Sequence, residues 1–62
     1  MISDGDADLA AKFLIDQHGD EAALYAAGRA DLLLGRGDLD GSAVWRRIRA
    51  AIEELKRDNA SS

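Results

Sequence analysis

The chain contains no cysteine, no proline and a single histidine, and each shortage limits what it can be. Without cysteine, neither a disulfide framework nor a thiolate zinc site can form, and one imidazole contributes little to any other metal site. Without proline, nothing in the chain obliges a helix to break or kink. We therefore expect no metal, no cofactor and a chain that is helical over most of its length.

Long apolar runs are also missing. The opening segment, MISDGDADLAAK, lacks a basic stretch followed by about seven to fifteen apolar residues, so it does not have the pattern of a secretory signal. No stretch approaches the roughly 20 apolar residues that span a bilayer. The sequence predicts a soluble cytoplasmic protein that makes no use of a membrane.

Positive charge is scarce in the first two thirds of the chain. Residues 1–40 carry nine Asp and Glu against three Lys and Arg, whereas residues 41–62 carry three against five, and the net charge is −4. This balance argues against nucleic acid as the main partner. A chain of 62 residues also has little volume for a pocket with converging titratable groups, so we expect no enzyme and no small-molecule substrate.

Glycines and short polar clusters divide the chain into three predicted helices, at about 6–18, 20–34 and 41–57, with fraying at both ends. The caps expected at these boundaries are, in chain order, Ser3, Asp4 or Asp6, then Gly19, Asp20, and Asp40 or Ser42. Short loops between such helices favour antiparallel neighbours. The prediction is an all-α fold, a compact three-helix bundle with short Gly/Asp loops, in a single domain of residues 1–62.

The run 35-GRGDLDG-41 contains both an RGD tripeptide and the D-x-D-G core of a calcium loop. If Gly41 were the invariant glycine of that loop, Arg36 and Arg47 would occupy the first and last ligand positions, which need carboxylates. The run is better explained as a hinge, in which glycines end one helix and aspartates begin the next. Leu39 is then expected to tuck beneath the third helix as a hydrophobic staple.

Apolar periodicity assigns a buried face to the outer two helices. In the third helix the predicted stripe is Val44, Trp45, Ile48, Ala51, Ile52 and Leu55, with charged residues opposite. In the first helix it is Leu9, Ala10, Phe13 and Leu14.

The second helix carries apolar residues on two sides. Leu24, Tyr25, Gly28 and Leu32 form one side, and a mainly alanine side includes Ala26, Ala30 and Leu33. If the first side faces the interior, then Ala26, Ala30 and Leu33 are candidate contacts for a partner or a second copy. The alternative is that a central helix touches both neighbours and has no surplus face.

Exposed arginines offer a second candidate surface. Arg46 and Arg47 are expected to contact an anionic protein partner, while Arg49 can pair with Glu53 four residues later. These observations predict a small protein–protein interaction module, either an accessory or regulatory subunit or a homo-oligomer. The alternative function is a small nucleic-acid-associated regulator that uses Arg46, Arg47 and Arg49. His18 is expected to stabilise a helix end and to have no catalytic role.

Four short motifs, QHG, A-x-x-RAD, GD-x-DG and W-R-R-I-x-x-A-I-x-x-L, follow one another between Leu9 and Leu55. In this order they resemble a group of short helical proteins of unknown function from α-proteobacteria. The resemblance implies a helical fold and brings no activity, cofactor or site with it.

Overall fold

The computed structural model describes residues 4–60, and helix covers all of them except residues 36–38. The elements are α1 (Asp4–His18), the 3-10 turn η1 (Gly19–Glu21), α2 (Ala22–Gly35) and α3 (Leu39–Ala60). All three predicted helices are present within a few residues of their expected bounds. Residues 1–3 and 61–62, which include the candidate cap Ser3 and part of the ends expected to fray, lie outside the described residues.

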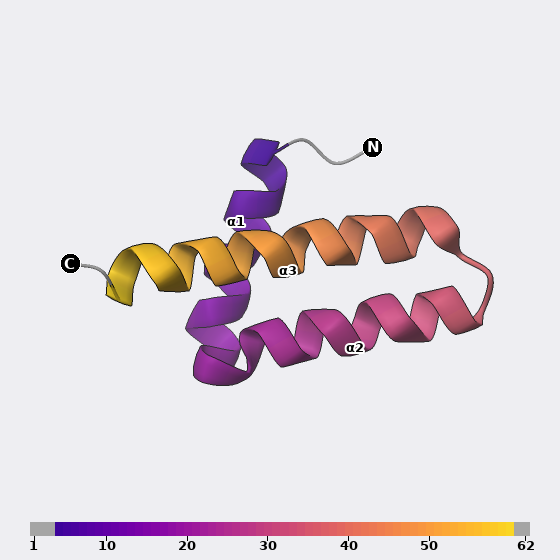
Figure 1. The fold of residues 1–62 in the computed structure, drawn as a ribbon, viewed down its shortest axis with the longest axis horizontal. Coiled ribbons are helices and arrows are strands. Elements are labelled where there is room, and N and C mark those ends of the chain that lie inside the picture. The colour runs from indigo at the N-terminus through magenta and orange to yellow at the C-terminus, as the bar shows by residue number, and fades with distance from the viewer. Residues whose placement is uncertain (1–3, 61–62) are drawn as a thin grey trace.

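Helices α2 and α3 form a helical hairpin, and α1 crosses this hairpin (Figure 1). Helices α2 and α3 lie side by side and run in opposite directions, whereas α1 crosses α3 steeply. Because α1, η1 and α2 follow one another without a break, they form one helical run that bends at η1. The fold is all-α as predicted, with no strand among the described residues, but it is not the expected bundle of three antiparallel neighbours.

The bend between α1 and α2 occurs at Gly19, whose φ of 60° is the left-handed conformation predicted for it. The expected Asp20 cap is wrong, because His18 and Glu21 precede η1 and α2 and neither makes a side-chain capping hydrogen bond. Instead, the Asp20 carbonyl accepts a hydrogen bond of 3.3 Å from Lys56 Nζ, which also lies 3.9 Å from Asp20 Oδ1. Lys56 thereby links the bend to α3.

The loop at the other end of α2 is a hinge, as the sequence predicts. Gly37 has a φ of 82°, and its amide donates to the Leu34 carbonyl at 3.0 Å. The amide of Asp38 donates to the Leu33 carbonyl at 2.9 Å, which completes a Schellman motif at the end of α2. Asp38 also begins α3, because its Oδ1 accepts a hydrogen bond of 2.8 Å from the Gly41 amide.

The cap of α3 is therefore Asp38, and the predictions of Asp40 or Ser42 are wrong. Asp40 lies in the first turn of α3, and Ser42 is buried two residues further on. Leu39 is largely exposed, so the expected staple is also wrong. Gly41 suits the cap because an added Cβ would lie only 2.6 Å from the Asp38 Oδ2 atom.

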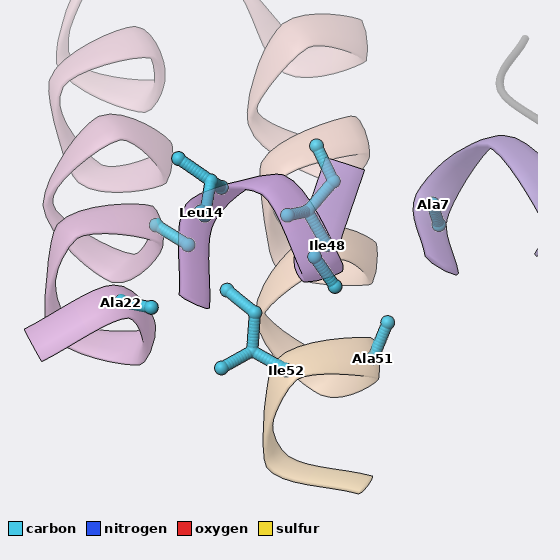
Figure 2. Packing of buried hydrophobic residues seen from close by; sticks show 8 residues of the cluster. Ala7, Leu14, Ala22, Ile48, Ala51 and Ile52 are labelled. Carbon is cyan, nitrogen blue, oxygen red and sulfur yellow. The ribbon is translucent and has the colours of Figure 1, made fainter. Parts of the chain in front are cut away.

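The core lies where the three helices meet, and it consists mostly of alanine (Figure 2). Among the described residues, the large apolar side chains that are buried are Leu14, Ile48 and Ile52. The other buried apolar residues are Ala7, Ala11, Ala22, Ala26, Ala30 and Ala51. Since Val44, Trp45 and Leu55 pack at the edge of this cluster, the stripe predicted for the third helix is confirmed.

The stripe predicted for α1 is half right, because Leu14 is buried and Ala10 packs against the core. Leu9 and Phe13 are exposed, and the buried face consists of Ala7, Ala11 and Leu14. These three positions are spaced by four and three residues, which places them on one side of a helix. The small side chains of Ala7 and Ala11 allow α1 to pack against α3, and the larger Leu9 and Phe13 are turned to the opposite side.

The side of α2 that was expected to be exposed is buried, and the opposite side is exposed. Ala26 is 0% exposed and Ala30 is 4% exposed, while Leu33 is half-buried. Ala22, Ala26 and Ala30 form a row that repeats every four residues and faces the rest of the fold. Ala26, Ala30 and Leu33 are therefore part of the interior packing, and the assignment of this side as an exposed apolar strip is wrong.

Candidate protein-interaction surface

The exposed face of α2 carries Leu24, Tyr25, Gly28 and Leu32, which we call the outer strip. Leu24 is 73% exposed, Leu32 is 45% exposed and Tyr25 is 41% exposed. Gly28 lies between them, and a Cβ added there would have no neighbouring atom within 4 Å. The strip is thus an apolar row along one helix, and its central residue, Gly28, has no side chain.

The outer strip follows from the way that α2 packs on its other side. Helical geometry turns successive residues by about 100°, so a helix that buries positions 22, 26 and 30 presents positions 24, 28 and 31 to solvent. The buried positions are alanines, which bring α2 close to its neighbour but bury little area. The leucines of the helix are left outside or at the edges of the contact.

Seven large apolar side chains are exposed among the described residues. Besides the outer strip, they include Leu9 and Phe13 on α1 and Leu34 and Leu39 beside the hinge. Single exposed leucines are common on proteins, but a row of them along a helix commonly marks a surface that associates with another chain. The row is most continuous on α2.

One edge of the outer strip is supported by aromatic contacts. The rings of Tyr25 and His18 are stacked, with centroids 4.5 Å apart and planes inclined by 16°. Tyr25 also meets Trp45 edge to face at 5.9 Å, and the Arg29 guanidinium lies 5.7 Å from the Trp45 ring. His18 therefore orients Tyr25 from the end of α1, a role that its position in the sequence did not predict.

The two ends of the outer strip carry opposite charges. Asp20 and Glu21 lie at its N-terminal end, and Arg36 lies at its C-terminal end. The Asp20 side chain is fully exposed, with a relative accessibility of 103%, so its contact with Lys56 leaves its carboxylate open to solvent. An apolar centre bordered by charged groups is the usual arrangement of a protein–protein interface.

Arg46 and Arg47, which are predicted to contact an anionic partner, line a shallow groove of about 630 Å³ between α1 and α3. Its lining is Ala7, Asp8, Ala43, Arg46, Arg47, Ala50, Ala51 and Glu54. Arg46 and Arg47 thus share the groove with two carboxylates. Arg49 lies on α3 outside this groove and forms an ion pair of 3.0 Å with Glu53, as predicted. The groove presents both signs of charge.

No helix in the described part of the chain is long and apolar enough to cross a membrane. Over the same residues, no cluster of His, Asp and Glu side chains could hold a metal ion. The resemblance to helical proteins of α-proteobacteria stays a prediction. No family model, curated protein or solved structure matches this chain.

Proposed function

We propose that this chain is a small protein–protein interaction module, an accessory or regulatory subunit or a homo-oligomer, that binds through the outer strip of α2. The observation that carries the proposal is the placement of large and small apolar residues. Leu24 and Leu32 are exposed, while Ala26 and Ala30 on the same helix are buried. A partner that covers the outer strip would remove two leucines and a tyrosine from water, which favours association.

The shape of the outer strip favours a helical partner. Gly28 exposes the backbone of α2 at the middle of the strip, so another helix can approach closely there. Leu24 and Leu32 lie one turn away on either side and would flank the crossing point. Since the Tyr25 ring is held by its contacts with His18 and Trp45, it would lose less conformational freedom on binding than a free side chain.

Two features weigh against the alternative, a nucleic-acid-associated regulator. Arg46 and Arg47 share their groove with Asp8 and Glu54, whose carboxylates would repel phosphate. Arg49 is already paired with a carboxylate, that of Glu53. The same carboxylates would also repel acidic groups of a protein, so the contact of Arg46 and Arg47 with an anionic protein partner stays a secondary prediction.

Site-specific photo-crosslinking tests the proposal. A benzophenone amino acid replaces Leu24 in one variant and Arg49 in a control, since both positions are exposed but lie on different helices. After illumination of cells that express the chain, we expect covalent protein adducts from position 24 and far fewer from position 49. Equal yields at the two positions, or none at position 24, would contradict an interaction through the outer strip.

A further inference from the structure

We propose that the partner of the outer strip is a second copy of this chain, with the two α2 helices antiparallel and crossing at Gly28. This inference rests on the proposed function, and it adds the identity and the orientation of the partner. A two-fold symmetric contact requires a self-complementary surface, in which any residue that meets a second residue of the copy is itself met by that second residue in return. The outer strip has this property.

The apolar and polar residues of the strip match when one α2 is turned end to end about Gly28. Leu24 and Leu32 lie four residues on either side of Gly28, so each leucine stands at the level of the other leucine in the copy. Tyr25 and Asp31 lie three residues on either side, so the phenol of one copy and a carboxylate of the other stand at the same level, on opposite sides of the crossing point. Both Leu24 and Asp31 are exposed in the monomer.

The charges at the ends of the strip match in the same orientation. Asp20 and Arg36 lie eight residues on either side of Gly28, Asp20 in η1 just before α2 and Arg36 directly after α2. An antiparallel pair therefore brings Asp20 of each copy to the level of Arg36 in the other. A parallel pair would instead place like charges together at both ends. Opposed helix dipoles favour the antiparallel orientation as well.

The predicted dimer is a weak one. A helix with the length of α2, 14 residues, is roughly 21 Å long, so a contact along it falls below the roughly 800 Å² per partner of a standard interface. The whole described chain exposes only 4419 Å². We expect dimers to form from about 10 μM upward, and the exchange of subunits to be fast.

A charge-exchange experiment with the purified full chain tests the orientation. Asp20→Arg gives a copy with Arg at both ends of the strip, and Arg36→Asp gives a copy with acids at both ends. In sedimentation equilibrium we expect each variant alone to dimerise at least about tenfold more weakly than wild type. An equimolar mixture of the two should dimerise as tightly as wild type, because every end contact is then between opposite charges. Circular dichroism confirms that each variant stays folded.

The matched control is Arg49→Asp, which changes the net charge by the same amount as Arg36→Asp but on α3. It should leave the dimerisation constant unchanged. A wild-type chain that stays monomeric to about 1 mM overturns the proposal, as does a mixture that dimerises no better than its components. If the purified chain is monomeric while position 24 still captures a different protein in cells, the outer strip remains an interaction surface and only the second copy is excluded.

Discussion

The packing of α2 predicts opposite outcomes for two exchanges between alanine and leucine on the same helix. Ala26→Leu adds three carbon atoms at a position that is 0% exposed, whereas Leu24→Ala removes a side chain that is 73% exposed. Alanine and leucine both favour helix, so the comparison isolates packing from helix propensity. Ala26→Leu should destabilise the fold, and Leu24→Ala should leave it nearly unchanged.

The magnitudes follow from the burial at each position. Forcing a larger side chain into a filled site typically costs about 1–3 kcal/mol, out of roughly 3–9 kcal/mol expected for a whole chain of this length. One kcal/mol corresponds to about 4–8 °C in a domain of this size, so Ala26→Leu should lower the Tm by about 4–24 °C. Leu24→Ala is an exposed substitution, so its effect should stay within about 0.5 kcal/mol.

Thermal unfolding followed by circular dichroism makes the comparison, at a protein concentration where the wild-type chain is monomeric. Urea unfolding at 25 °C gives the same free energies without the temperature dependence. The reasoning is refuted if Leu24→Ala is the more destabilising of the two. That result would mean that α2 buries its leucine side and exposes Ala26, and the outer strip would then not exist.

Two further substitutions probe the start of α3. Ser42→Ala should raise the free energy of unfolding by about 1 kcal/mol, because the Ser42 hydroxyl is buried without a hydrogen-bond partner among the described residues. Urea unfolding measures this change. A lower free energy of unfolding in the variant would mean that the hydroxyl is hydrogen-bonded. Asp38→Ala should lower the free energy of unfolding by about 0.5–2 kcal/mol, because it removes the hydrogen bond that caps the Gly41 amide. Asp38→Asn should retain most of the stability of the wild-type chain, because asparagine also caps helices. Equal losses of stability in both variants would speak against a capping role.

The sequence predicts α3 well because the residues on its two sides differ in polarity. Large apolar residues repeat on one side of this helix and charged residues occupy the other, so only one orientation buries the apolar set. The same reasoning fails for α1 and α2, where apolar residues occur on both sides. Given a choice between Phe13 and Ala11, size favours Phe13 for the interior, yet Ala11 is buried and Phe13 is exposed.

Size fails as a guide because the helices approach closely. Where two helices are near each other, a leucine at the contact would collide with the opposite backbone, and alanine fits. The useful signal in the sequence is spacing: Ala22, Ala26 and Ala30 recur every four residues on one line of α2. A strict alanine row predicts a close contact better than the hydrophobicity of the opposite side does. The equal spacing of Leu24 and Leu32 on either side of Gly28 is likewise visible in the sequence.

The hinge influences which side of α2 is exposed, because it holds α2 close to α3. Only residues 36–38 separate α2 from α3, and the hydrogen bonds of Gly37 and Asp38 fix the direction in which the chain turns. A loop this short holds the ends of the two helices together, so the side of α2 that faces α3 has room for little more than alanine near the core. Leu24 and Leu32 are then directed away from α3. The motif-like segment at the hinge thus has a structural role, because it helps to determine which side of α2 is exposed.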